Sequence, residues 1–296
     1  MNAPEECTPL CQGADPSPRP SWFKMPEGAC DTHMHIFGSR ARYPMVPNRS
    51  YTPPEATVEA YETLARVLRI RRTVIVQPSV YGIDNACTLD ALLALSLEAR
   101  AIVAVDGDVS DAELQRLHAR GARGIRFNML MSGGIGIADA ERLAERIKGM
   151  GWHIEVMIDV SCDPECTERF GRLGVPVVFD HIGHLRPCTR TDDPGFRDMV
   201  RLVGEGHCWV KLSGAYRVTV EDRAPYADVG AHVRALLEVN PQRCLWATDW
   251  PHPGINVPMP NDGALLDMLG YWIRDAAMRR RILVDNPADL YGFAAV

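Results

Sequence analysis

The chain has 296 residues, of which 46% are hydrophobic and 24% are charged, and its formal net charge is −6. This content suits one large α/β domain, and the absence of a basic run argues against a nucleic-acid partner. No stretch reaches the roughly 18 continuous apolar residues of a membrane span. The nine scattered cysteines, with no secretory leader before them, favour a reducing, cytoplasmic location.

The first 26 residues differ in composition from the rest of the chain. Pro16, Pro18 and Pro20 interrupt any regular element in this segment. We therefore expect residues 1–26 to form a flexible or surface-wrapping extension, and residues 27–296 to form the folded domain.

Beyond the extension, short β-branched runs alternate with segments whose apolar residues recur at helical spacing. Most of these runs are continuously apolar, which is typical of strands covered on both faces. We predict strands at 29–35, 73–79, 101–107, 122–128, 153–159, 175–181, 208–214 and 244–250. We predict helices at 54–69, 84–99, 110–120, 137–150, 163–173, 194–205, 226–239 and 262–283.

Eight alternating strand–helix units predict a single (β/α)8 TIM barrel, an α/β fold. The main rival is a doubly wound open sheet. That fold loses its usual support, because no GxGxxG motif or phosphate-binding loop follows any predicted strand.

Polar residues gather at the carboxyl ends of the predicted strands, where barrel enzymes carry their chemistry. His33 and His35 end the strand at 29–35, and alternation directs both side chains to one face. His181 and Asp249 end two later strands. Three imidazoles and a carboxylate could bind one divalent metal. Without metal, they could polarise a carbonyl while the aspartate activates water.

An ordered series of motifs supports one family. The segments ACDTHMHIFG, ARGIRFN, VFDHIGH, VKLSGAYR and LWATDWPHP, between about Gly28 and Phe293, resemble the amidohydrolase superfamily. Within it, they are most similar to the branch of pyrone dicarboxylate lactonases and galactarolactone isomerases. The resemblance implies that His33, His35 and His181 surround a lactone carbonyl and stabilise its oxyanion. It also implies that Asp249 takes a proton from the attacking water.

The same resemblance implies a substrate-binding set. Arg126 and Arg217 would hold a substrate carboxylate, a contact that a planar guanidinium makes with two hydrogen bonds. Asn128 would join them, and Tyr51 and Ser79 would line the mouth of the site. For Tyr51 and Ser79, ordinary packing remains the alternative.

The resemblance also bears on the metal. Binuclear amidohydrolases carry a carboxylated lysine on the fourth strand and a histidine on the fifth. Here the strand at 122–128 ends in Arg126 and Asn128, and the strand at 153–159 ends without histidine. The positive charge of Arg126 would also repel a dication. We expect no metal and no cofactor; the alternative is one zinc ion on His33, His35, His181 and Asp249.

The expected activity is hydrolysis of a carboxylated lactone, similar to 2-pyrone-4,6-dicarboxylate or a muconolactone. Pyrone dicarboxylate lactonases carry a second arginine after the RFN motif, whereas residues 129–136 contain no cation, so a different acidic lactone stays open. Three alternatives remain: a sugar-acid lactone isomerase, a mononuclear zinc hydrolase or decarboxylase, and a non-catalytic acid-binding barrel. The sequence does not indicate an oligomeric state.

Two further histidines follow strand ends that carry site residues. His184 and His252 are candidates to orient those residues, with an ordinary loop histidine as the equal alternative.

Overall fold

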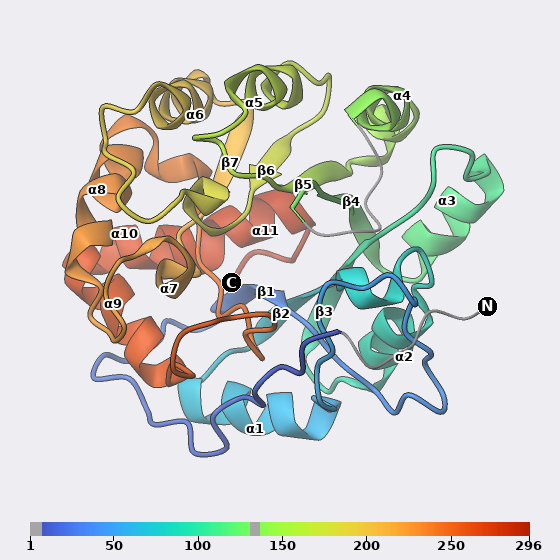
Figure 1. The fold of residues 1–296 in the computed structure, drawn as a ribbon, viewed down its shortest axis with the longest axis horizontal. Coiled ribbons are helices and arrows are strands. Elements are labelled where there is room, and N and C mark those ends of the chain that lie inside the picture. The colour runs from blue at the N-terminus through green and yellow to red at the C-terminus, as the bar shows by residue number, and fades with distance from the viewer. Residues whose placement is uncertain (1–7, 131–136) are drawn as a thin grey trace.

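The computed structural model describes residues 8–130 and 137–296, and its sheet is a barrel of eight parallel strands in chain order (Figure 1). The strands are β1 (Cys30–Met34), β2 (Arg72–Val76), β3 (Glu98–Val103), β4 (Ala122–Asn128), β5 (His153–Met157), β6 (Val177–Phe179), β7 (Cys208–Lys211) and β8 (Cys244–Leu245). Backbone hydrogen bonds join the two ends of the sheet: Thr32 N donates to Trp246 O at 3.2 Å, and His35 N donates to Trp250 O at 2.8 Å. The predicted (β/α)8 barrel is confirmed.

Helices surround this sheet (Figure 1). They are α1 (Val58–Leu68), α2 (Ala86–Ala94), α3 (Asp111–Ala119), α4 (Ile137–Ile147), α5 (Pro164–Gly171), α6 (Pro194–Glu205), α7 (Ala215–Val218), α8 (Gly230–Val239), α9 (Asp262–Trp272), α10 (Ala276–Arg280) and α11 (Asn286–Tyr291). The side chains of Thr57, Ser110 and Asp193 begin three of them by accepting hydrogen bonds from first-turn N–H groups. Among the described helices, none combines the length and apolar character needed to cross a membrane.

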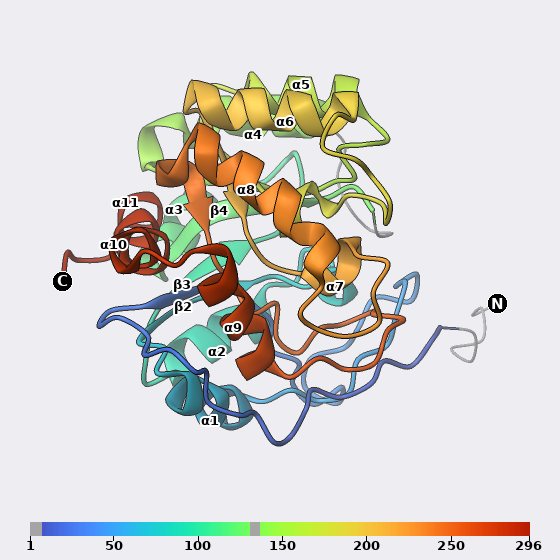
Figure 2. The same ribbon diagram turned by 90° about the vertical axis from the view of Figure 1, so that its left-hand side faces the viewer.

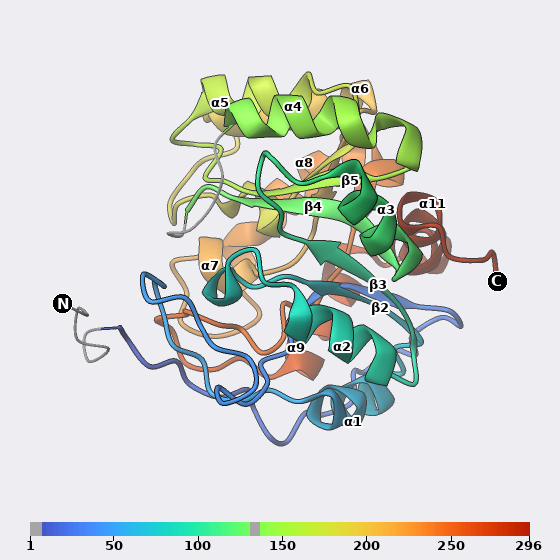
Figure 3. The same ribbon diagram turned by 90° about the vertical axis from the view of Figure 1, so that its right-hand side faces the viewer.

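The interior of the barrel is apolar at its amino-terminal end. Inward-facing residues of several strands, among them Val74, Ile102 and Val178, form a cluster with Tyr291 and Phe293 near the C-terminus. Figures 2 and 3 place α11 and the C-terminus at one end of the barrel and α7 at the other. The apolar cluster therefore leaves the carboxyl ends of the strands as the place for polar chemistry.

Most predicted elements have bounds that differ from those in the structure, as three of them illustrate. β3 begins at Glu98 and ends at Val103, earlier than the predicted 101–107. β8 ends at Leu245, and Asp249, which follows it, has a φ of +65°. The helix predicted at 262–283 is interrupted after Trp272. Asp275 starts the new helix α10 by accepting hydrogen bonds from two backbone N–H groups.

The described part of the N-terminal extension lies against the barrel. Leu10 pairs with Thr52, and Ser21 Oγ donates to Asp267 on α9 at 2.6 Å. These contacts attach residues 8–26 to the loop after β1 and to a late helix. The division of the chain at residue 26 stays a prediction.

Candidate active site

One cavity at the carboxyl ends of the strands contains eight of the nine predicted site residues. Its lining includes His35, His181, Asp249, Arg126, Arg217, Tyr51, Ser79 and Asn128. The ninth, His33, is fully buried beside the cavity, with Nε2 at 3.3 Å from Nε2 of His35. The structure thus brings all nine together, and it adds Pro78, Met157 and Pro253 to the cavity wall.

Asp249 is the centre of this arrangement. Arg217 Nε donates to its Oδ2 at 2.7 Å, and the Tyr216 hydroxyl donates to the same atom at 2.5 Å. Its Oδ1 is buried and has no hydrogen-bond partner among the described residues. Three imidazole nitrogens face that oxygen, namely Nε2 of His181 at 3.6 Å, of His35 at 3.7 Å and of His33 at 3.9 Å. One oxygen is therefore fixed by protein donors, and the other is available to a ligand.

The backbone holds two of these groups in an uncommon conformation. Asp249 has a φ of +65° and His181 has a φ of +49°, in the left-handed region that non-glycine residues seldom adopt. The Asp249 amide donates to His33 O at 2.9 Å, which ties the end of β8 to β1. Gly214 passes so close to the His181 ring that a Cβ at this position would lie 3.0 Å from it. Such strained residues typically cluster at functional sites.

The charges of the site follow from burial and from its arginines. Burial raises the pKa of Asp249, but Arg217 and the three histidines lower it more, so the net pKa lies well below the usual range. Burial lowers the pKa of His181 to about 4 and that of His35 to about 3. Burial also holds the pKa of His33 well below its usual range. At neutral pH the site is an ionised carboxylate facing neutral imidazoles.

The hydrogen bonds of the imidazoles decide which of them can donate. Nδ1 of His35 lies 2.8 Å from Val76 O, and a carbonyl oxygen only accepts, so His35 carries its proton on Nδ1. The lone pair on its Nε2 therefore faces the cavity. Nδ1 of His181 lies 3.0 Å from Ser213 Oγ, a hydroxyl that can donate or accept. His35 is thus an acceptor within the cavity, and His181 can be a donor.

Both predicted arginines reach the cavity. Arg126 Nη1 lies 3.3 Å from His33 Nε2 and 3.4 Å from Gln77 O. Arg217 donates from Nη2 to Pro253 O at 3.0 Å as well as from Nε to Asp249. Their role in holding a substrate anion stays a prediction. The loop that follows the RFN motif falls partly on residues 131–136, outside the described residues.

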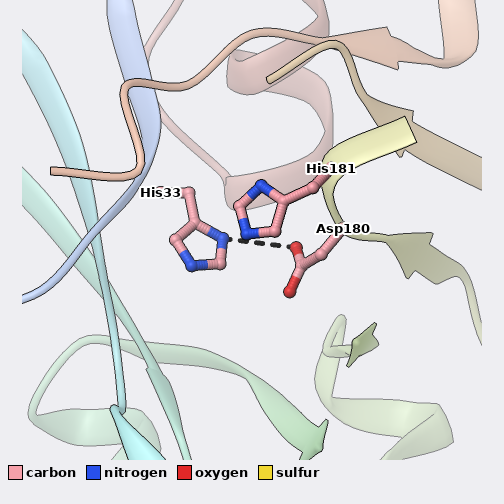
Figure 4. Close-up of side chains that lie close together, drawn as sticks. All are labelled: His33, Asp180 and His181. Carbon is pink, nitrogen blue, oxygen red and sulfur yellow. Dashed lines mark hydrogen bonds and ion pairs between the residues drawn. The ribbon is translucent and has the colours of Figure 1, made fainter. Parts of the chain in front are cut away.

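Three charged groups beneath the cavity were not predicted to be site residues. Lys211 on β7, Glu155 on β5 and Asp180 after β6 are all fully buried, and all three lie within 3.3 Å of His33 Nδ1. Figure 4 shows the contact between His33 and Asp180, with His181 beside them. The signal was present: Lys211 and Glu155 are charged residues inside otherwise buried strands.

Sequence reasoning also missed Tyr216. Its hydroxyl lies 2.8 Å from His252 Nδ1, and His252 Nε2 lies 3.1 Å from Asp262. His252 therefore contacts the residue that holds Asp249, as expected of a group that orients others. His184 is close to His181, at 6.3 Å between ring centroids, but its Nε2 has no partner among the described residues.

The donor set can accommodate one divalent cation. His33, His35 and Asp249 each offer one ligand atom within 4.8 Å of the others, and His181 Nε2 lies beside them. Two or three imidazoles with a carboxylate suit tetrahedral zinc, which would polarise a carbonyl and lower the pKa of a bound water. Arg126 Nη1, 3.3 Å from His33 Nε2, places a positive charge at the same position.

The fold and this site define a (β/α)8 barrel with the buried Asp–His site of an enzyme, and comparison with known proteins supplies the family. The family profile described as Amidohydrolase matches residues 30–293, so the chain belongs to the amidohydrolase family and is a hydrolase of that superfamily. The family expected from the motifs is thereby confirmed.

Two curated relatives and one solved structure resemble the chain over nearly its whole length. A 4-sulfomuconolactone hydrolase of Hydrogenophaga intermedia is 37% identical over 295 residues, which are 98% of this chain and 97% of the relative. A 2-pyrone-4,6-dicarboxylate hydrolase of Comamonas testosteroni is 35% identical over 286 residues, 93% of each chain. An apo crystal structure of an Agrobacterium tumefaciens protein is 30% identical, with a TM-score of 0.83 over 95% of this chain and 100% of that one.

Proposed function

We propose that the protein hydrolyses a lactone that carries an anionic group, without a metal ion. One observation carries the proposal: Asp249 Oδ1 is buried, ionised and without a hydrogen-bond partner among the described residues, and it faces three neutral imidazoles. This geometry suits a general base that acts on a water molecule next to a carbonyl group.

In the proposed reaction, a water molecule binds between Asp249 Oδ1 and the lactone carbonyl. Asp249 accepts one proton while the water oxygen bonds to the carbonyl carbon. His33 and His181 donate to the oxyanion that develops, with Arg126 beside them, and the lone pair of His35 accepts a hydrogen bond from the water. The ring C–O bond then breaks, and the leaving oxygen takes the proton from Asp249. The product is an open-chain hydroxy acid or its keto form.

The cations of the cavity favour an anionic substrate. Arg217 currently places two of its donors on Asp249 Oδ2 and Pro253 O. A substrate carboxylate or sulfonate at this arginine would weaken its hold on Asp249 and so raise the pKa of that base toward the working pH. Binding of the correct anion would thus activate Asp249. The relatives act on a sulfonated and on a dicarboxylated lactone, according to their names, which supports this substrate class.

We propose the metal-free form because positive charge is already supplied where a metal would act. Arg126 lies against His33 Nε2, and Arg217 lies on Asp249. A dication among these groups would be repelled by both guanidinium ions. The alternative is one zinc ion on the three histidines and Asp249. Measuring the metal content of active protein distinguishes the two forms.

We also propose a cytoplasmic location. The eight cysteines within the described residues are free thiols, as expected in a reducing compartment.

A panel of lactones tests the proposed activity. It includes 2-pyrone-4,6-dicarboxylate, muconolactones with carboxylate or sulfonate groups, aldarolactones, and neutral lactones of equal ring size as controls. We expect turnover of at least one anionic lactone, none by Asp249→Asn, and incorporation of ¹⁸O from labelled water into the product. Turnover without ¹⁸O would indicate isomerisation. Binding of acids with no turnover of any lactone would indicate a non-catalytic barrel.

A further inference from the structure

A buried lysine contacts the face of His33 that points away from the cavity. Lys211 Nζ lies 2.5 Å from Glu155 Oε2, 3.2 Å from Asp180 Oδ1 and 3.0 Å from His33 Nδ1. All four side chains are fully buried from bulk solvent. An ammonium group carries three protons. The contact with His33 Nδ1 is a hydrogen bond, and the contacts with Glu155 and Asp180 are ion pairs.

Three groups face His33 Nδ1: the oxygens Asp180 Oδ1 at 3.2 Å and Glu155 Oε1 at 3.3 Å could accept a proton from it, whereas Lys211 Nζ at 3.0 Å could donate one to it. If Nδ1 carried the proton, one N–H of Lys211 would point at another N–H and be left without an acceptor. An unsatisfied buried donor costs about 1–3 kcal/mol. If Nδ1 carries the lone pair instead, it accepts from Lys211, the ammonium group also faces both carboxylates, and the single ring proton of the neutral histidine lies on Nε2.

This assignment does not depend on which member of the Lys211–Glu155 pair holds their shared proton. Burial raises the pKa of Glu155 to about 7, so this carboxyl group can hold the proton that lies between the pair at neutral pH. In that state the amine lone pair accepts from Glu155. Its two N–H groups still serve Asp180 and His33, and Nδ1 of His33 again accepts.

The contacts of His33 on the cavity side also agree with a proton on Nε2. Nε2 of His33 lies 3.3 Å from Nε2 of His35, whose lone pair is exposed because its Nδ1–H serves Val76 O. A proton on His33 Nε2 places one hydrogen between the two rings, whereas its absence would set two lone pairs against each other. Arg126 Nη1 lies 3.3 Å from the same Nε2, and a donor there favours a lone pair on Nε2. Arg126 can instead donate to Gln77 O, so it does not require that lone pair.

We propose that Lys211 is a positioning residue that, together with Glu155, directs the ring proton of His33 to Nε2. The proposal rests on the proposed function for its purpose: a neutral imidazole stabilises an oxyanion only through an N–H that faces it. In resting protein this N–H points to the His35 lone pair, and a bound lactone carbonyl would compete for it. His35, held in the other tautomer by Val76, cannot take this role.

Nitrogen-15 NMR reads the tautomer without any substrate. Protein labelled with ¹⁵N-histidine is compared with the His33→Gln variant to assign the His33 resonances. We expect a protonated Nε2 and an unprotonated Nδ1 at neutral pH. A protonated Nδ1 would overturn the proposal. This readout is independent of the lactone panel, so either proposal can fail alone.

The causal test replaces the buried pair together. Lys211→Met/Glu155→Met removes both charges, because removing one would leave an uncompensated buried ion and risk unfolding. His33 Nδ1 then faces only Asp180 Oδ1, at 3.2 Å, and should become protonated. We expect kcat to fall about 10²- to 10³-fold with KM within about twofold, the scale of losing one oxyanion donor. An unchanged tautomer in the folded double variant would contradict the proposal.

Asp180→Asn is the matched control. It alters the other neighbour of Nδ1 but keeps Lys211 as a donor, so the proton of His33 should stay on Nε2. A shift of that proton to Nδ1 in this variant would show that Asp180 governs the tautomer, against the proposal. Lys211→Met/Glu155→Met and Asp180→Asn are compared by thermal unfolding, which separates loss of the tautomer from loss of the fold.

Discussion

Asp249 and Asp180 are two buried carboxylates on opposite sides of the His33 ring. Asp249 lies on the Nε2 side, and Asp180 lies on the Nδ1 side. Each has a pKa well below the usual range, because nearby cations outweigh the effect of burial, which raises it. The difference is access: Asp249 lines the cavity, whereas Asp180 lies beneath it against Lys211.

The comparison teaches that burial and charge do not by themselves identify a catalytic base. Asp249 is held through Oδ2 by Arg217 and Tyr216, which leaves Oδ1 turned toward a ligand. Asp180 Oδ1 lies 3.2 Å from Lys211 Nζ and 3.2 Å from His33 Nδ1. Its Oδ2 also has no hydrogen-bond partner among the described residues, but it lies outside the cavity lining, 3.6 Å from Arg126. The first carboxylate can exchange a proton with substrate water, and the second can only support its neighbours.

The largest expected effect separates these two residues. Asp249→Asn removes the proton acceptor and should lower kcat by about 10³-fold or more, since general-base catalysis contributes on this scale. Asp180→Asn should lower kcat by only about tenfold, because it acts through His33. Steady-state kinetics on the best lactone of the panel measures both. Equal losses of kcat in the two variants would contradict the assignment of Asp249 as the base and Asp180 as a supporting residue.

Arg217 tests the connection between the substrate anion and Asp249. Arg217→Met should raise KM for anionic lactones about 10- to 100-fold, as expected when a charge-assisted contact is lost. It should change KM for a neutral lactone little. Removing this cation should also raise the pKa of Asp249. An unchanged KM for anionic lactones would exclude Arg217 from substrate binding.

Tyr216 tests how firmly Oδ2 of Asp249 must be held. Tyr216→Phe removes the hydroxyl that contacts Asp249 and His252 but leaves Arg217 in place, so we expect kcat to fall about 5- to 20-fold with little change in KM. Tyr226→Phe, at a buried tyrosine outside the cavity lining, is the control for general destabilisation. Equal losses in the two variants would show that the Tyr216 contact only stabilises the fold.

The smallest effect is expected from pH. Asp249 stays ionised well below neutrality, His181 has a pKa of about 4 and His35 of about 3. The reactive state therefore persists as pH falls, and kcat/KM should be nearly constant between about pH 8 and pH 5 before it declines. In Arg217→Met the acid limb should move to higher pH. A wild-type decline centred near pH 6.5 would mean that a histidine with an ordinary pKa controls the reaction.

Many residues that line the cavity could be predicted from the sequence, because a parallel barrel brings the carboxyl ends of all its strands to one end. His33, His35, His181 and Asp249 follow apolar runs, so the fold alone places them at one end. Their hydrogen bonds could not be predicted in the same way. Which oxygen of Asp249 is free depends on Arg217 and Tyr216 in the loop after β7, and loop geometry leaves no periodic pattern.

The charged neighbours of His33 Nδ1 were harder to predict for a different reason. Lys211 and Glu155 lie inside buried strands, where periodicity predicts only apolar residues. A charged residue there signals a buried partner, but the partner lies on another strand, and register is not encoded locally. The strand β8 is also shorter than predicted. The backbone turns at Asp249, which places this carboxylate in the site, and the sequence pattern does not show that turn.

The most direct test of the account is the activity of protein stripped of metal. Protein is treated with a chelator, its metal content is measured by mass spectrometry, and kcat/KM is determined on an anionic lactone before and after zinc is added. The account predicts full activity with far less than one metal ion per chain and no gain from zinc. Activity lost on chelation and restored by one equivalent of zinc would contradict it, and would assign His33, His35, His181 and Asp249 to a metal centre.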